Sequence, residues 1–339
     1  MPRAVILTTG GTIATSRNAA SGELEVSLAG SELARMVAGL GIEVRIEELF
    51  RVPSTELTVE HALGLCRAIS RAVSDEVNGI AVTHGTATLE EVAFFVSLVV
   101  SGPQPVVFTG AMRDADQADA DGPRNLRDAL RVAAADASRG RGVLVVMDGD
   151  ILNAASVVKR HANRVGAFGA RQGGAEGCVT EAGLMYFSDP HPPPMRFSAD
   201  RVERRIDLVR TCFDLDPAVI SSALDRGVRG LVIDAMGGDG ITPALKAPLL
   251  DALNGGVAVA VATRCPEGSC TPKHPVAREL AQRGAVFARS LDGLKARILL
   301  MLALGESPER DDLQQLFDRM SGFSLPQGIL PQPREAMPA

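Results

Sequence analysis

A strand, a polar turn and the start of a helix follow one another in Gly79-Ile80-Ala81-Val82-Thr83-His84-Gly85-Thr86-Ala87-Thr88-Leu89-Glu90-Glu91. In an α/β protein this order presents turn side chains at the carboxyl edge of a parallel sheet. Gly85 lets the backbone approach a ligand closely, and the hydroxyls of Thr86 and Thr88 are able to serve chemistry. A plain helix cap explains the turn equally well, with Thr86 or Thr88 as N-cap and acidic residues in the first turn.

A second turn of the same kind opens the chain. An apolar strand at residues 4–7 ends in Thr8-Thr9-Gly10-Gly11-Thr12-Ile13-Ala14-Thr15. The glycine spacing matches neither the dinucleotide-binding nor the P-loop fingerprint, so the sequence disfavours an NAD-type oxidoreductase. The turn offers the hydroxyl of Thr12, which follows two glycines. A helix N-cap is the simpler interpretation of Thr12 taken alone.

The remaining chain alternates short apolar runs with helical patterns. This alternation predicts an α/β fold, with a larger N-terminal domain whose mostly parallel sheet has helices on both faces, and a smaller C-terminal α/β domain. Residues 16–30 lack periodicity and indicate a loop, a candidate lid. Residues 157–161 read as a helix end or loop that carries Lys159. Helices are predicted at 31–40, 58–77, 92–100, 124–135, 217–225, 243–253, 275–282, 293–303 and 309–320, and further strands at 42–49, 104–109, 142–147, 206–209, 230–234, 257–262 and 285–287.

The domain organisation follows from a proline run at residues 190–194. Such a run is stiff and can neither join a sheet nor continue a helix. We therefore predict an N-terminal domain at residues 1–187, a Pro-rich linker at 188–205, a C-terminal domain at 206–325 and a frayed tail at 326–339.

Composition excludes several classes of function. The net charge of −6 is modest and no basic stripe is present, and with no Trp and one Tyr there is no aromatic platform for nucleic acid. No apolar stretch reaches the roughly 20 residues of a membrane helix, and the N-terminus enters a strand directly instead of forming a signal peptide. Five scattered cysteines indicate free thiols in the cytoplasm. Cys265 and Cys270 have no second ligand pair at zinc spacing, so no metal and no cofactor are expected.

Together the two turns carry a resemblance to a known family. Thr9-Gly10-Gly11-Thr12-Ile13-Ala14 and Thr83-His84-Gly85-Thr86-Ala87-Thr88-Leu89-Glu90-Glu91 resemble the two signature segments of bacterial-type L-asparaginases and glutaminase-asparaginases. The segments 106–113, 120–126, 142–147 and 295–300 also resemble the family, in the same order along the chain. The resemblance spans almost all of the chain and implies hydrolysis of a small carboxylate-bearing amide.

The resemblance also implies roles for particular residues. Thr12 corresponds to the family's nucleophile, which forms an acyl-enzyme, while Thr86 and Lys159 complete the catalytic set. A lysine desolvated among polar neighbours acts as a base, directly or through a second hydroxyl. Two protomers of a homodimer or homotetramer close each site in the family. The substrate-binding residues are expected to be Gly11, Ser54, Thr55, Gly85, Ala87 and Ala111, with Ser54 holding the substrate carboxylate and Ala111 contributing a backbone N–H to the oxyanion site.

The departures from the family pattern concern the substrate's α-amino group. Ala87 stands where the family has an Asp that supports the Thr–Lys pair and grips the amino group. The family's loop tyrosine is missing as well, because residues 16–30 contain no Tyr; Thr55 replaces a glutamine, and Asp239 stands roughly where the neighbouring subunit's Asn is expected. A deliberate Asp-to-Ala change explains only the first departure. We therefore expect an amidohydrolase with altered or lost amino-group recognition.

Two alternatives stay open at this point. The chain could be a catalytically impaired or engineered asparaginase variant, or a protein of the same fold that binds a small amide without turning it over. Simpler interpretations also exist for single residues: a solvated surface charge for Lys159, a packed histidine for His84, a turn residue for Ser54, and helix-dipole partners for Glu90 and Glu91.

Overall fold

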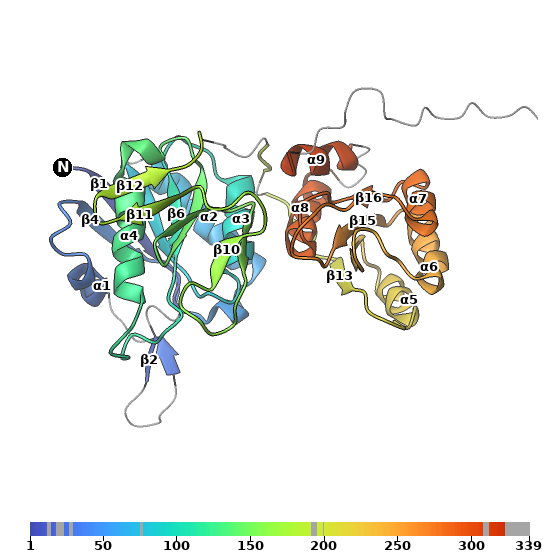
Figure 1. Cartoon of the computed structure of the whole chain (residues 1–339), viewed down its shortest axis with the longest axis horizontal. Coiled ribbons are helices and arrows are strands. Elements are labelled where there is room, and N and C mark those ends of the chain that lie inside the picture. The colour runs from blue at the N-terminus through green and yellow to red at the C-terminus, as the bar shows by residue number, and fades with distance from the viewer. Residues whose placement is uncertain are drawn as a thin grey trace, which may run out of the picture.

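The computed structural model describes residues 1–11, 15–17, 24–26, 30–74, 77–190, 195–198, 200–307 and 312–322. Strands and helices alternate along much of the chain, apart from a run of strands between residues 143 and 210 (Figure 1). The strands are β1 (Arg3–Thr8), β2 (Thr15–Arg17), β3 (Leu24–Val26), β4 (Glu43–Glu48), β5 (Gly79–Thr83), β6 (Val106–Thr109), β7 (Val143–Met147), β8 (Asp150–Asn153), β9 (Val157–Lys159), β10 (Phe168–Ala170), β11 (Gly177–Thr180), β12 (Gly183–Tyr186), β13 (Ile206–Arg210), β14 (Gly230–Ala235), β15 (Ala258–Thr263) and β16 (Val286–Phe287). The α-helices are α1 (Gly30–Met36), α2 (Val59–Ser74), α3 (Leu89–Val99), α4 (Gly122–Ala134), α5 (Ala218–Asp225), α6 (Pro243–Asn254), α7 (Pro275–Gln282), α8 (Gly293–Glu306) and α9 (Leu313–Met320), and a short 3-10 helix, η2, spans Ser54–Glu56.

The larger sheet is mostly parallel, as predicted. Within the described residues its order is β12-β11-β8-β7-β6-β5-β1-β4. β4, β1, β5, β6 and β7 run parallel, and β8, β11 and β12 extend the sheet antiparallel beyond β7. β1, β5, β6 and β7 are buried apolar runs, because helices cover both sides of the sheet there, whereas β4 at the edge alternates exposed and half-buried residues.

The strand order identifies the point at the sheet edge where a ligand site is expected. β4 and β5 lie on opposite sides of β1, so the chain reverses its direction of winding between β1 and β5. In open α/β sheets, ligands bind beyond the carboxyl ends of the strands at such a reversal. The turns that leave β1 and β5 are Gly10-Gly11 and His84-Gly85-Thr86, the same two turns that stand out in the sequence.

Helices pack on both faces of the larger sheet. Ala4 and Ile6 of β1 point to the face covered by α1 and α4, while Val5 and Leu7 point to the face covered by α2 and α3. Alternation of side chains along a strand produces this division. The prediction of an α/β domain with helices on both faces is confirmed.

A smaller parallel sheet, β13-β14-β15-β16, forms the C-terminal part. Helices α5, α6 and α7 cover one face, and α8 covers the other. α8 also packs against α3 and therefore lies between the two sheets (Figure 1). Its sequence is apolar nearly all round, which is typical of a helix buried on every side.

Several predicted elements differ from the structure. Residues 157–161, expected as a helix end or loop, hold the strand β9, which pairs antiparallel with β10. The predicted loop at 16–30 contains part of β2 and all of β3, which pair antiparallel; residues 18–23 and 27–29 lie outside the described residues. α1 ends at Met36, earlier than predicted, and Gly39 and Gly41 follow at positive φ. The sequence does not predict β8, β10, β11 and β12, because strands of three or four residues are too short to show a period.

The domain limits stay a prediction, and residues 191–194, 199 and 323–339 lie outside the described residues. None of the helices in the described part of the chain combines the length and apolar character needed to cross a membrane.

Candidate active site

Thr86 and Lys159 meet beyond the carboxyl end of β5. The Lys159 Nζ donates a hydrogen bond of 2.8 Å to the Thr86 Oγ1. Thr86 is 8% exposed and Lys159 is half-buried, so Lys159 is not the solvated surface charge of the simpler interpretation. Nor does Thr86 cap the following helix: Thr88 holds the N-cap position of α3 without a side-chain capping bond. The geometry leaves the Thr86 hydroxyl directed at an amine.

Burial favours the neutral form of the Lys159 amine, the form that is able to accept a proton. Desolvation lowers the pKa of Lys159, and the carboxylate of Glu90 partly opposes that shift. Glu90 also accepts a hydrogen bond of 2.8 Å from the Lys159 backbone N–H. Burial raises the pKa of Glu90 itself, against the lowering effects of Lys295 and Lys159. Glu90 thus does more than complement the helix dipole, a role that its sequence position alone did not reveal.

Glycines bring the first turn against the second. A Cβ on Gly11, whose φ is +88°, would stand 2.4 Å from the Gly85 backbone N. A Cβ on Gly85 would stand 2.5 Å from the Ser54 Oγ. Contacts this short exclude any side chain, so both positions require glycine. Gly11 and Ser54 therefore both lie in close contact with Gly85, the residue before Thr86. Thr12, the predicted nucleophile, lies outside the described residues and follows Gly11 in the chain.

The turn after β4 packs against the same two turns. Ser54 is buried in η2, and its carbonyl accepts a hydrogen bond of 3.0 Å from the Thr88 Oγ1. Thr55 and Ala87 are both exposed. The methyl group of Ala87 offers neither charge nor a hydrogen-bond partner at this exposed rim of the turns.

Ala111 belongs to a third turn, which follows β6. Ala111 is buried, and a Cβ on its neighbour Gly110 would stand 3.1 Å from the Thr86 Cγ2. Asn125 donates to the Gly110 carbonyl at 3.0 Å, and the Asp121 carboxylate accepts from the Met112 backbone N–H at 3.0 Å. These bonds hold the turn that carries Ala111 beside Thr86.

His84 supports the second turn from beneath. It is fully buried, and burial lowers its pKa to about 4, so the ring is neutral near pH 7. Its Nδ1 lies 2.8 Å from the Gly85 carbonyl, which requires the proton to be on Nδ1. The prediction of a packed histidine is confirmed, and the ring also orients Gly85.

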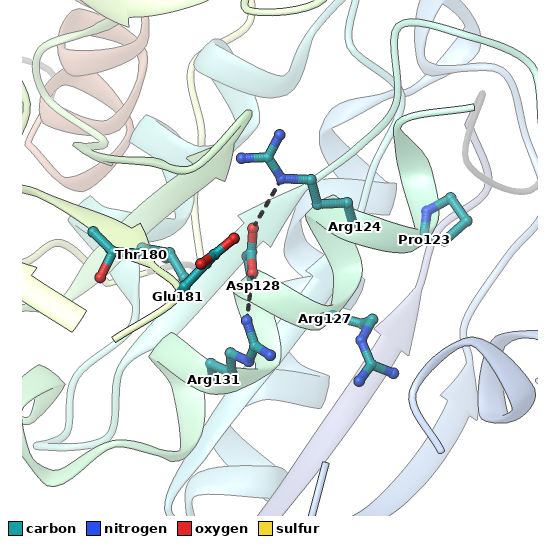
Figure 2. Close-up of a pocket in the computed structure, with 8 residues that line it drawn as sticks. Pro123, Arg124, Arg127, Asp128, Arg131, Thr180 and Glu181 are labelled. Carbon is teal, nitrogen blue, oxygen red and sulfur yellow. Dashed lines mark hydrogen bonds and ion pairs between the residues drawn. The ribbon is translucent and has the colours of Figure 1, made fainter. Parts of the chain in front are cut away.

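A groove of about 710 Å³ lies elsewhere, along α4 (Figure 2). Arg124 and Arg131 there both pair with the carboxylate of Asp128, and Arg127 donates to the carbonyls of Met36 and Ala38. Its cations are therefore engaged within the protein. The groove contains neither Thr86 nor Lys159 and is distinct from the candidate site.

Comparisons with known proteins agree over nearly the whole chain. The family model described as "Asparaginase, N-terminal" matches residues 3–191, and "Glutaminase/Asparaginase C-terminal domain" matches residues 205–317. A probable L-asparaginase of Deinococcus radiodurans is 36% identical over 94% of this chain and 97% of its own length. L-asparaginase 2 of Escherichia coli is 31% identical over 94% of this chain and 93% of its own length. The crystal structure of a probable cytoplasmic L-asparaginase from Campylobacter jejuni is 27% identical, with a TM-score of 0.83 over 94% of this chain and 99% of that one.

Proposed function

The chain belongs to the asparaginase family and is a hydrolase of amide C–N bonds, and from this premise we propose that it cleaves a small, carboxylate-bearing, asparagine-like amide through a threonine nucleophile. One observation carries the proposal: the 2.8 Å hydrogen bond between Lys159 Nζ and Thr86 Oγ1, at the reversal point of the sheet. The contact between Gly11 and Gly85 adds support, because Thr12 is covalently joined to Gly11.

The catalytic roles follow from the path that the proton of the nucleophile must take. A hydroxyl is a weak nucleophile until a base removes its proton, and the lowered pKa of Lys159 increases the fraction of neutral amine. In the proposal, the Thr12 oxygen attacks the amide carbon while its proton passes through the Thr86 hydroxyl to Lys159. The amide nitrogen takes that proton back from the relay and leaves as ammonia when the tetrahedral intermediate collapses. Water then attacks the acyl-enzyme ester and loses a proton to the relay, which returns it to the Thr12 oxygen as the acid is released.

The substrate-binding roles rest on the three turns. We assign the substrate carboxylate to Ser54 and the neighbouring backbone of Gly11 and Gly85, with Thr55 at the rim. The turn that bears Ala111 is held rigidly beside Thr86, which suits a backbone donor to the oxyanion. Such preorganised donors strengthen as negative charge develops on the carbonyl oxygen.

Recognition of the α-amino group is altered or lost in this proposal. A bound ammonium needs a carboxylate or several acceptors, and the methyl group of Ala87 supplies neither. An amide without a free α-amino group therefore loses little binding energy here. We further propose a homodimer or homotetramer in the cytoplasm, with a second protomer closing the rim on which Thr55 and Ala87 are exposed.

Ammonia release tests the proposal directly. L-asparagine and succinamate, the same ω-amide without the amino group, are compared at saturating and subsaturating concentration. Wild-type enzyme is expected to release ammonia from both, and Thr12→Val from neither. Asparagine as the better substrate by a wide margin contradicts altered amino-group recognition, and full activity of Thr12→Val contradicts the nucleophile.

A binding protein on the same fold is the second candidate. The alanine at position 87 favours it, since the family's supporting carboxylate is absent. The pairing of Thr86 with Lys159 favours the enzyme, because binding alone needs no hydroxyl–amine pair. A rise in melting temperature with L-asparagine or succinamate, without ammonia release from either, would establish the binding protein.

A further inference from the structure

Lys295 is a fully buried lysine in the first turn of α8. It is 1% exposed, and its backbone N–H is capped by the Asp292 side chain at 2.9 Å. The first turn of a helix disfavours cations, and desolvation of an ammonium is costly unless it is paired. The lysine therefore occupies a position that both helix electrostatics and burial disfavour, and its contacts must compensate.

The Lys295 ammonium reaches out of its own domain to β9. Its Nζ donates to the Val157 carbonyl at 2.7 Å and to the Asp292 Oδ2 at 3.2 Å. Val157 begins β9, two residues before Lys159. Helix α8, which covers the smaller sheet, thus supplies the side chain that holds β9. That strand carries Lys159, the candidate base.

The hydrogen-bond pattern of β9 explains why this contact is needed. The Ser156 carbonyl and the Arg160 N–H both bond to the β10 side of the hairpin, at 2.7 Å each. In an antiparallel pair, alternate residues direct their backbone groups to the partner and away from it. Val157 and Lys159 therefore turn their backbone groups to the outer edge of β9, where no strand pairs with them among the described residues.

Two charged side chains fill that outer edge. Lys295 bonds the Val157 carbonyl at 2.7 Å, and the Glu90 Oε2 accepts the Lys159 N–H at 2.8 Å. The cation meets the acceptor and the anion meets the donor, so each bond is charge-assisted. Glu90 comes from α3, the helix that packs against α8 (Figure 1).

We propose that Lys295 and Glu90 form a clamp on the outer edge of β9 that positions the Lys159 amine against Thr86. Lys295 is a positioning residue in this inference, which rests on the proposed function of Lys159. The clamp couples the C-terminal part of the chain to the chemistry of the N-terminal site. A misplacement of about 1 Å at a reacting group can reduce a rate by about a hundredfold.

The test compares Lys295→Met with a matched control on the same helix. Arg297 also donates from α8 to a backbone carbonyl, that of Ile206 at 2.8 Å, but Ile206 belongs to β13 and not to β9. Steady-state ammonia release from L-asparagine or succinamate, whichever wild type turns over faster, is measured for both. Lys295→Met is expected to lower kcat about ten- to a hundredfold with KM within about twofold, while Arg297→Met keeps kcat within about threefold. A folded Lys295→Met with wild-type kcat, or an equal loss in Arg297→Met, overturns the clamp.

Variants of Glu90 test the other half of the clamp, and they keep the clamp testable if Lys295→Met fails to fold. Glu90→Gln retains an acceptor oxygen for the Lys159 N–H, and Glu90→Ala does not. The clamp predicts that Glu90→Ala loses at least about tenfold more kcat than Glu90→Gln. Equal kcat values for the two variants overturn it. Lys159→Met separates the two claims: if it keeps its activity, the proposed function itself fails, whereas an inactive Lys159→Met beside fully active clamp variants refutes the clamp alone.

Discussion

The Lys159 Nζ donates to the Thr86 hydroxyl across 2.8 Å, although the two residues lie 73 positions apart in the chain. One belongs to a short strand of a hairpin and the other to the turn after a central parallel strand. The reversal of strand order between β1 and β5 makes room for both at one edge of the sheet.

The Thr86 hydroxyl should be required for turnover and dispensable for folding. Thr86→Val keeps the shape of the side chain and removes the oxygen, so kcat for ammonia release is expected to fall by about a thousandfold or more, with a melting temperature close to that of wild type. Thr86→Ser restores the hydroxyl and should recover at least part of this loss. Equal activity of the Val and Ser variants would exclude a relay through this oxygen.

The pH dependence of kcat/KM should report the Lys159 amine. Burial lowers the pKa of Lys159 from the ordinary 10.5, and the neutral amine is the active form, so activity rises with pH through a midpoint below that value. Glu90 raises the pKa of Lys159, and Glu90→Gln should therefore move the midpoint to lower pH. A midpoint that moves up in Glu90→Gln would contradict this assignment.

A carboxylate at position 87 should change substrate preference. Ala87 is exposed at the rim, so Ala87→Asp adds an acceptor for an ammonium group without disturbing the core. The ratio of kcat/KM for L-asparagine to that for succinamate is expected to rise about tenfold or more, since a charge-assisted hydrogen bond contributes about 1.5–3 kcal/mol. Ala87→Ser, which adds a hydroxyl but no charge, is the control and should shift the ratio far less.

His84 should make folding sensitive to mild acid. Its pKa is about 4 in the folded chain, below the ordinary 6.5, because burial disfavours the imidazolium. Between these values the unfolded chain binds a proton that the folded chain does not, so the free energy of unfolding falls as the pH drops from 6.5 towards 4, by about 3 kcal/mol at the lower limit.

Urea unfolding at pH 6.5 and pH 4.5 measures this difference. His84→Gln removes the titrating group while keeping a donor for the Gly85 carbonyl, and it should lose His84's share of the acid sensitivity. An unchanged pH slope in His84→Gln would mean that other groups cause the acid sensitivity.

The sequence predicts a helix or strand wherever the element is long enough to show its hydrophobic period. The central strand with its polar turn, the amphipathic α2 and the proline-started α6 and α7 all follow from local pattern. The strand β9 did not, because three residues cannot distinguish strand from loop; its pairing with β10 depends on the intervening turn at 160–167. The resemblance therefore places Lys159 in the site, but the local sequence does not identify the strand that carries it.

Sequence patterns do not reveal the contacts that support the catalytic residues from neighbouring elements. Glu90 is spaced like an ordinary helix-dipole partner, and only the fold shows that it also bonds the Lys159 N–H. Lys295 resembles any lysine at the start of a helix, and its burial arises because α8 lies between two sheets. The alanine at position 87, in contrast, is read directly from the sequence, and the resemblance alone implies that it stands in the place of the family's Asp.

The most direct measurement is ammonia release by Lys159→Met beside Arg160→Met, an adjacent and exposed cation that serves as the matched control. The account predicts that Lys159→Met folds and loses about a thousandfold or more of kcat, while Arg160→Met keeps most of the activity. A folded Lys159→Met with kcat within about tenfold of wild type would contradict the role of the amine as the base and, with it, the proposed mechanism.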